Sequence, residues 1–280
     1  MNMSEGLEKI FFFSGSNQRR LLGMLYRPNP LHTRQTGIVY CHPFAEEQNM
    51  AHTVAVNACR AFTQLGYPVL RFDMSGCGDS EGILDEMEVS SWLEDICAAI
   101  KVIRQESDVQ GVALFGLRLG AGLALLHASS DEAAPSFLIL WEPVLDFTLY
   151  IRQFLRRTIV SRIVSNTLDD TTVGNLEQQL ADVGRINVIG YPITKGLFDS
   201  FCAVSKKTLD YNPPCPALVL SISHMGKPST QLIKYRDYLK SNQAESMFDH
   251  IQAEPFWDRY WRWECPEVIE RTVQWLAEHR

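Results

Sequence analysis

Short apolar segments alternate with segments of helical periodicity along most of this 280-residue chain. The apolar segments have the length and side-chain content of β-strands, and they cover residues 10–13, 21–26, 37–41, 67–72, 109–115, 137–141, 217–222 and 246–251. Apolar residues recur at helical spacing in residues 53–65, 90–104, 119–128 and 266–279. Strands that alternate with helices form mostly parallel sheets with helices on both faces. The sequence therefore predicts an α/β fold with a mostly parallel central sheet, preceded by a hairpin of its first two strands.

Residues 146–212 interrupt this alternation. They begin with a basic helical stretch and continue as polar, loop-prone sequence, and the basic residues are Arg152, Arg156, Arg157 and Arg162. An insertion between two strands often forms a lid at the carboxyl ends of the strands, where such sheets bind ligands. We therefore expect a core of residues 1–145 and 213–280 and a helical cap of residues 146–212. The alternatives are a surface insertion without a function and, for the arginines, either a solvated helix face or contact with an anionic substrate or a membrane.

Composition and charge exclude several classes of protein. The chain has 26 Lys and Arg against 33 Asp and Glu, a net charge of −7, so we expect no nucleic-acid partner. A hydrophobic content of 46% excludes disorder for most of the chain. The longest apolar run contains Arg118 and His127, so we expect no transmembrane segment. The amino terminus lacks the pattern of a signal peptide, which favours a cytoplasmic protein.

The seven cysteines show no pairing pattern, because their number is odd and no two have the C-x-x-C spacing. We therefore expect neither a disulfide framework nor a metal site, and a reducing compartment. The sequence suggests no cofactor. It leaves the oligomeric state open, a homo-oligomer included.

The segment Gly116-Leu117-Arg118-Leu119-Gly120 lies between a predicted strand and a predicted helix. Its spacing is that of the G-x-S-x-G nucleophile elbow, in the strand–turn–helix context that this motif needs. The middle residue is Arg118, whose guanidinium stays protonated and cannot attack a carbonyl. Residues 223–228, where the triad acid is expected, hold no carboxylate, and the loop after residues 246–251 holds no histidine. The conventional positions of a Ser-His-Asp triad are therefore empty.

Two other loops support the same comparison. His42-Pro43 follows the strand at 37–41, where α/β-hydrolases often carry a His-Gly pair beside the oxyanion hole, and residues 73–80 read D-x-x-G-x-G-x-S, a loop of the same superfamily. The chain therefore resembles an α/β-hydrolase with an inserted cap. His42 is a candidate general base, or alternatively orients the oxyanion loop. Asp146 is either a displaced triad acid or the N-cap of the first cap helix.

Arg118 at a helix N-terminus needs an anion, because that end of a helix carries partial positive charge. The internal candidates are Glu46, Glu47, Glu142 and Asp79, of which Glu46 and Glu47 lie closest in this fold. The external candidate is a carboxylate or phosphate ligand held by Arg118 and by the N–H groups of Phe44 and Leu119. The two solutions can coexist. Trp257 is expected at the edge of the same site.

Several sequence strings together resemble the bacterial family named exosortase A system-associated hydrolase 2. They are HPFAEEQN (42–49), GCGDS (76–80), GLRLG (116–120), LWEPV (140–144), QFLR (153–156) and FW (256–257). The resemblance implies an α/β-hydrolase fold, an arginine at the elbow as a family trait, and a setting near exopolysaccharide production and exosortase-based protein sorting. This sequence departs from the family at Asp258-Arg259, where Gln-Thr is expected.

Two functional classes follow. The first is an enzyme that hydrolyses or transfers the acyl group of an ester or thioester, in which Arg118 and the oxyanion hole polarise the carbonyl while Glu47 or His42 activates water. The second is a binder or scaffold that holds an anionic acyl or sugar intermediate, or a partner protein, in the same cleft. A conventional serine hydrolase with a relocated triad is a third, weaker alternative.

Overall fold

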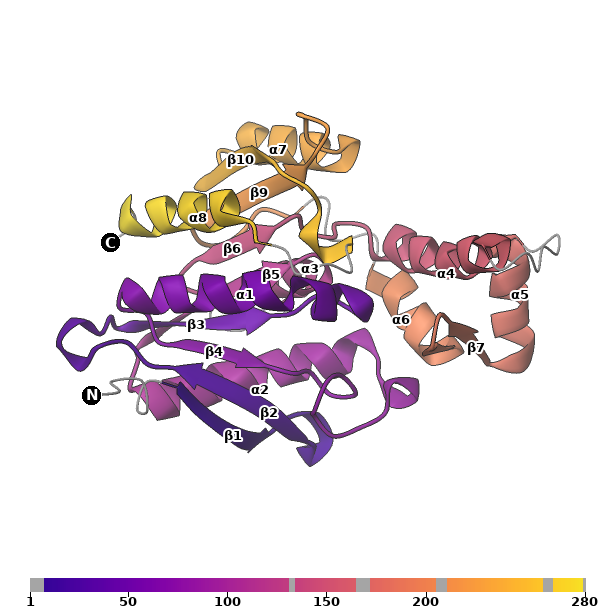
Figure 1. The fold of residues 1–280 in the computed structure, drawn as a ribbon, viewed down its shortest axis with the longest axis horizontal. Coiled ribbons are helices and arrows are strands. Elements are labelled where there is room, and N and C mark those ends of the chain that lie inside the picture. Colours follow the sequence, from indigo (N-terminus) through magenta and orange to yellow (C-terminus); the bar gives the residue numbers. More distant parts are fainter. Residues whose placement is uncertain (1–7, 131–133, 165–171, 205–210, 259–263, 279–280) are drawn as a thin grey trace.

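Eight strands form one twisted sheet in the computed structural model, which describes residues 8–130, 134–164, 172–204, 211–258 and 264–278. In chain order the strands of this sheet are β1 Glu8–Ser14, β2 Arg20–Tyr26, β3 Thr36–Cys41, β4 Val69–Phe72, β5 Gly111–Leu117, β6 Leu138–Trp141, β9 Ala217–Ser223 and β10 Ser246–Gln252. Their order in space is β1-β2-β4-β3-β5-β6-β9-β10 (Figure 1). The β1–β2 and β2–β4 pairs are antiparallel and the others are parallel, which confirms the predicted mostly parallel sheet and its leading hairpin.

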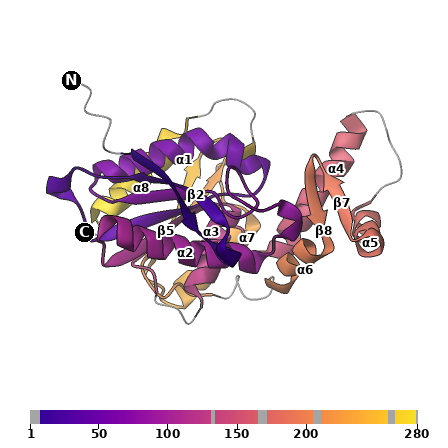
Figure 2. The same ribbon diagram turned by 90° about the horizontal axis from the view of Figure 1, so that it is seen from below.

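Helices cover both faces of the sheet, as the alternating pattern predicts. On one face lie α1 Glu46–Gln64 and α8 Pro266–Glu278, and on the other lie α2 Val89–Ser107, α3 Leu119–Ala128 and α7 Thr230–Ser241 (Figure 2). The strands bury alternate side chains against these two layers, and each layer has its own apolar core. Single turns of 3-10 helix occur at Ser16–Gln18, Pro30–His32, Leu84–Glu86 and Phe256–Asp258. The architecture is the α/β-hydrolase fold.

Two helices that cover the sheet, α1 and α7, differ from the sequence prediction. Helix α1 begins at Glu46, seven residues before the predicted start at residue 53, because its polar first turn carries no apolar repeat. Helix α7 was not predicted at all, since its sequence TQLIKYRDYLKS is mostly polar and only Leu232, Tyr235 and Leu239 are buried.

Residues 147–164 and 172–204 form a separate group of elements beside the carboxyl ends of the strands, and we call this group the inserted segment (Figure 1). It contains α4 Phe147–Val164, α5 Val173–Val183, the antiparallel pair β7 Arg185–Val188 and β8 Tyr191–Thr194, and α6 Lys195–Val204. The expectation of loop-prone sequence after the basic helix was wrong, because α5 buries Leu176 and Leu180 one turn apart and α6 buries Leu197 and Phe201. The side chain of Arg162 lies outside the described residues.

The turn from β5 into α3 depends on its two glycines. A Cβ on Gly120 would collide with the carbonyl of Cys41, and one on Gly116 would collide with the backbone of Ala121. Both collisions are with backbone, so neither side can move away cheaply. The glycines therefore bring α3 close against the sheet and fix the position of Arg118 between them. Among the described residues no helix is long and apolar enough to cross a membrane.

Candidate functional site

Three neighbouring strands end level with one another at the candidate site. In the parallel register Cys41 of β3 lies opposite Gly116 of β5, and Leu117 of β5 lies opposite Trp141 of β6. Just beyond these ends, three residues other than glycine have positive φ, namely Ala45 (55°), Arg118 (53°) and Glu142 (40°). Such conformations are strained for residues with a Cβ and gather at functional sites. The edge of the sheet where the sequence predicts the site is thus also a place where backbone strain is concentrated.

The backbone of Arg118 is held on both sides. Its N–H donates to the Trp141 carbonyl at 3.0 Å, and its own carbonyl accepts from the N–H groups of Gly122 and Val144, each at 3.1 Å. These three bonds tie the elbow to the next strand, to α3 and to the loop that leads into the inserted segment. They offset the strain at φ 53° and keep the side chain directed out of the sheet end.

The guanidinium of Arg118 is paired with Glu47 and packed against two aromatic rings. Its Nε lies 3.5 Å from Oε2 of Glu47. Its central carbon lies 5.3 Å from the ring centre of Trp257 and 5.7 Å from that of Tyr150, within the range of cation–π attraction. Burial alone would lower the pKa of Arg118, but the Glu47 carboxylate and other nearby acidic groups raise it above its ordinary value. Arg118 is therefore a fixed, fully charged cation.

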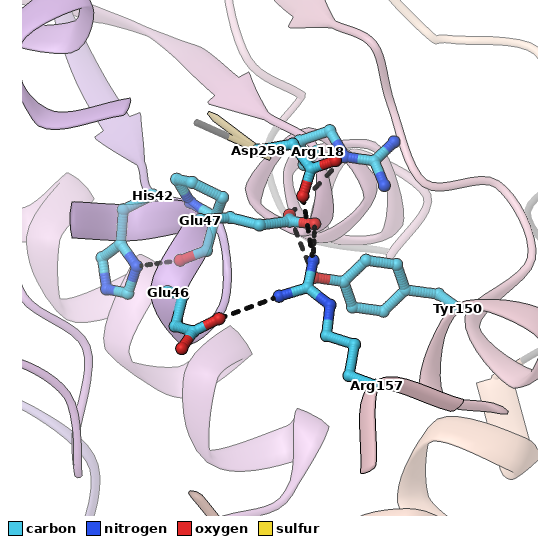
Figure 3. Close-up of polar contacts among 8 residues, drawn as sticks. His42, Glu46, Glu47, Arg118, Tyr150, Arg157 and Asp258 are labelled. Carbon is cyan, nitrogen blue, oxygen red and sulfur yellow. Dashed lines mark hydrogen bonds and ion pairs between the residues drawn. The ribbon is translucent and has the colours of Figure 1, made fainter. Parts of the chain in front are cut away.

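Glu47 receives contacts from several groups at once (Figure 3). The Tyr150 hydroxyl donates to Oε2 at 3.1 Å, and Nη2 of Arg157 lies 3.5 Å from Oε1. Burial, followed by the Glu47 charge, raises the pKa of Tyr150 well above its ordinary value, so the phenol remains a donor. The Glu47 side chain is only 4% exposed, and both of its oxygens are engaged. This arrangement makes Glu47 a counter-ion shared by two arginines.

The second expected counter-ion, Glu46, has Arg157 rather than Arg118 as its partner. It pairs with Nη1 of Arg157 at 3.3 Å, and Asp258 lies 3.8 Å from Nη2 of the same guanidinium. Arg157 therefore connects α4 of the inserted segment to α1 and to the turn that carries Trp257. The sequence grouped Arg157 with the other basic residues of α4, for which it predicted a solvated helix face or contact with an anionic substrate or a membrane. It did not predict the pairing with Glu46 and Glu47, because a helical repeat does not show which arginine faces the core.

His42 is hydrogen-bonded at both ring nitrogens. Nε2 accepts the Met74 N–H at 3.0 Å, which places the proton on Nδ1, and Nδ1 donates to the Pro43 carbonyl at 2.7 Å. Burial lowers the pKa of His42, so the ring is neutral. This geometry joins the loop after β3 to the loop after β4 and is that of an orienting histidine.

Phe44 lies in the loop between β3 and α1, and Leu119 is the first residue of α3. Phe44 is buried, and its ring packs against those of Trp92, Phe154 and Phe201. Leu119 is buried at the start of α3. The side chains of both residues belong to the apolar core, so only their N–H groups are candidates for ligand contact, and that contact stays a prediction.

A polar cavity of about 190 Å³ opens beside Arg118, between the sheet end, α4 and the start of α7. Glu142, Asp146, Tyr150, Gln153 and Ser229 line it together with Arg118. In Figure 3 the two terminal nitrogens of Arg118 point away from Glu47, so they are the part of the guanidinium that remains for a ligand. Oδ1 of Asp146 accepts the Leu149 N–H at 2.8 Å, as expected of the N-cap of α4.

A second, mainly apolar cavity of about 210 Å³ lies beside Phe44, which lines it together with Cys77, Leu84 and Tyr191. Burial raises the pKa of the Cys77 thiol to about 12, which makes it a poor nucleophile. Among the described residues, no three His, Cys, Asp or Glu side chains are grouped as a metal site requires. Arg259, part of the expected departure from the resembling family, lies outside the described residues.

Comparison with known proteins bears on the same region. A family model described as serine aminopeptidase, S33 (Hydrolase_4) matches residues 33–186. Mouse mitochondrial palmitoyl-protein thioesterase ABHD10 is 30% identical over 129 residues, which are 43% of this chain and 41% of that protein. An uncharacterized 31.7 kDa protein of Escherichia coli is 30% identical over 97 residues, 34% of this chain and 33% of its own. These matches span less than half the length of the curated relatives.

Solved structures extend the likeness over nearly the whole chain. Est1E from Butyrivibrio proteoclasticus, solved with ferulic acid bound, superimposes with a TM-score of 0.66 at 16% identity and covers 96% of this chain and 98% of its own. Mouse alpha/beta hydrolase domain-containing protein 10 superimposes with a TM-score of 0.61 at 16% identity, over 96% of this chain and 97% of its own. At these identities the likeness establishes the fold alone.

Proposed function

Because the chain belongs to the serine aminopeptidase S33 family of α/β-hydrolases, we propose that it hydrolyses, or transfers the acyl group of, an ester or thioester whose carbonyl or anionic group is bound by Arg118. The observation that supports this proposal most directly is the set of contacts that the Arg118 guanidinium makes. Glu47 pairs with its Nε, two aromatic rings pack against it, and its terminal nitrogens point away from Glu47 (Figure 3), while Arg118 lines a polar cavity. A cation fixed in this way can stabilise negative charge that develops on a carbonyl oxygen without reorganising.

Each predicted site residue has a role in this proposal. Arg118 replaces the usual nucleophilic serine and polarises the carbonyl, and the N–H groups of Phe44 and Leu119 complete the oxyanion hole. Glu46 and Glu47 hold the two arginines in place, and Trp257 packs on the guanidinium. His42 orients the oxyanion loop, since both ring nitrogens are already hydrogen-bonded. Because the Glu47 oxygens are shared among Tyr150 and two arginines, Glu47 is proposed as a positioning residue rather than as the base.

The substrate class in the proposal rests on relatives and on the resembling family. ABHD10 is a palmitoyl-protein thioesterase by name, and Est1E binds ferulic acid, so acyl compounds are the first class to test. The resemblance to exosortase A system-associated hydrolase 2 favours an acyl compound linked to exopolysaccharide production as the substrate. It also favours the cytoplasm of a bacterium as the place where this protein acts.

A second candidate is a binder of an anionic acyl or sugar intermediate that performs no chemistry. The observation in its favour is that the elbow carries a residue unable to act as a nucleophile, beside a carboxylate already engaged by two arginines. This candidate uses the same cavity and the same cation, and differs only in turnover.

Turnover of p-nitrophenyl esters and acyl thioesters by the purified protein separates the two candidates. The enzyme proposal expects hydrolysis that falls at least about a hundredfold in Arg118→Ala, the size of effect seen on losing an oxyanion-hole donor. Arg236→Ala, which removes a partly exposed arginine of α7, is the matched control and should leave the rate unchanged. Turnover that is equal in both variants would contradict a role for Arg118, and no turnover in the wild type would favour the binder.

A further inference from the structure

Glu142 is one of the three strained residues of the site, and the function proposed above leaves it without a role. It follows β6 directly, has φ 40°, and lines the same cavity as Arg118. Only 9% of the residue is exposed. From the sequence, Glu142 was predicted only as one of four possible counter-charges for Arg118. A carboxylate one residue beyond a strand belongs to no sequence motif that would indicate a further role.

Two backbone hydrogen bonds fix Glu142 against β9. Its N–H donates to the Leu220 carbonyl at 2.7 Å, and its Oε2 accepts the Ile222 N–H at 2.6 Å. The carboxylate of this cavity-lining residue is therefore held in one place. The other charged side chains that line this cavity are Arg118 and Asp146, and Asp146 is used as the N-cap of α4.

The surroundings of Glu142 favour proton uptake. Burial raises its pKa above the ordinary value of a carboxyl, while the Ile222 N–H and the charge of Arg118 offset only part of this effect. A carboxylate with a raised pKa is a better general base near neutral pH than an exposed one.

We infer that Glu142 is the general base of this site and takes a proton from a water that attacks a carbonyl bound by Arg118. The inference rests on the hydrolytic function proposed above and adds the base that this function needs. It is carried by the shared cavity, by the anchored carboxylate and by the two strained residues at adjacent strand ends.

The step balances without another co-reactant. The water oxygen bonds to the carbonyl carbon, its proton passes to Glu142, and the tetrahedral oxyanion lies against the Arg118 guanidinium. Collapse then breaks the bond to the alkoxide or thiolate, which takes the proton back from Glu142. One water is consumed, and a carboxylic acid and an alcohol or thiol are released.

The alternative is a purely structural role, in which Glu142 accepts the Ile222 N–H to stabilise the end of β9. Glu142→Gln separates the two roles, because the amide oxygen can still accept this N–H but cannot take a proton. If Glu142 is the base, kcat of Glu142→Gln should fall at least about a hundredfold, while its melting temperature should stay within a few degrees of that of the wild type. Glu177→Gln, at an exposed ion pair of the inserted segment, is the matched control and should keep full turnover.

The pH dependence gives a second, independent readout. A general base must be ionised, so kcat/KM of the wild type should fall as the pH drops through the raised pKa of Glu142, and Glu142→Gln should lose this acidic limb. Full turnover in Glu142→Gln would overturn the inference while the proposed function stands. No turnover in the wild type would overturn both.

If Glu142→Gln does not fold, Glu142→Asp decides the question instead. This variant keeps the charge but withdraws the carboxylate from the cavity by one methylene. Loss of most turnover with the acidic limb retained supports the base, and full turnover contradicts it.

Discussion

At the scale of single residues, we propose that a cation at the position of a nucleophile, Arg118, determines the chemistry of the site. Arg118 is held through its backbone by three hydrogen bonds and through its side chain by Glu47, Tyr150 and Trp257. The sequence indicated that Arg118 needs a counter-ion and pointed to the start of α1, because the loop after β3 meets the elbow in this fold. It could not indicate Tyr150 or Arg157, since their positions depend on how the inserted segment packs onto the core.

The hydrogen bond from Tyr150 to Glu47 should contribute more to stability than an ordinary one, because its acceptor is a buried charge. Tyr150→Phe is expected to lower the free energy of unfolding by about 1.5–3 kcal/mol, measured by urea denaturation. Tyr235→Phe is the control, since the Tyr235 hydroxyl donates to the neutral Tyr211 carbonyl, and it should cost about 0.5–1.5 kcal/mol. The reverse order would show that Glu47 does not depend on Tyr150.

His42 should make the protein less stable in mild acid. Burial lowers the pKa of His42 in the folded state, so below its unfolded pKa of about 6.5 the unfolded chain binds a proton that the folded chain does not. Stability is therefore lost as the pH falls from 6.5 toward the lowered folded pKa, at up to about 1.4 kcal/mol per pH unit. His42→Asn should lose less stability than the wild type over this interval, when the free energy of unfolding is measured at about pH 6.5 and again at a lower pH. An equal loss would contradict a neutral, buried His42.

At the scale of elements, the strands were the most predictable part of the fold. The continuous apolar runs of the central strands β3, β5, β6 and β9 follow from burial on both faces. All eight predicted segments overlap the observed strands of the large sheet. The polar helices were the least predictable, because α7 buries only three side chains and the first turn of α1 is acidic. The short apolar repeats of α5 and α6 became visible only in the structure.

The elbow should tolerate no side chain at Gly120. A Cβ there would meet the Cys41 carbonyl, so Gly120→Ala is expected to destabilise the protein by at least about 2 kcal/mol and to displace Arg118. Gly196→Ala is the matched control, because its Cβ would meet only the flexible end of Glu88 at 3.5 Å. Alanine in the helix α6 should be neutral or stabilising by up to about 1 kcal/mol. Thermal unfolding of both variants compares the two effects, and equal melting temperatures would contradict the tight packing of the elbow.

At the scale of the whole molecule, the inserted segment completes the site. Tyr150 and Arg157 reach from α4 to the acidic start of α1, and Arg157 also approaches the turn that carries Trp257. The polar cavity is closed by the core on one side and by α4 on the other. The fold class was available from the alternation of strands and helices, whereas the cavity depends on packing between segments far apart in the sequence.

The most direct test of the central account is whether Arg118 binds an anion in this cavity, because the binder holds an anionic ligand there and the enzyme releases a carboxylate there. Thermal unfolding is followed in the presence of butyrate and of butyramide, its neutral counterpart, for the wild type and for Arg118→Gln. The account predicts that butyrate increases the free energy of unfolding of the wild type by RT ln(1 + [L]/Kd) and so raises its melting temperature. Butyramide should not raise it, and Arg118→Gln should respond to neither compound. An equal response to butyrate in the wild type and in Arg118→Gln, or no response in either, would contradict it.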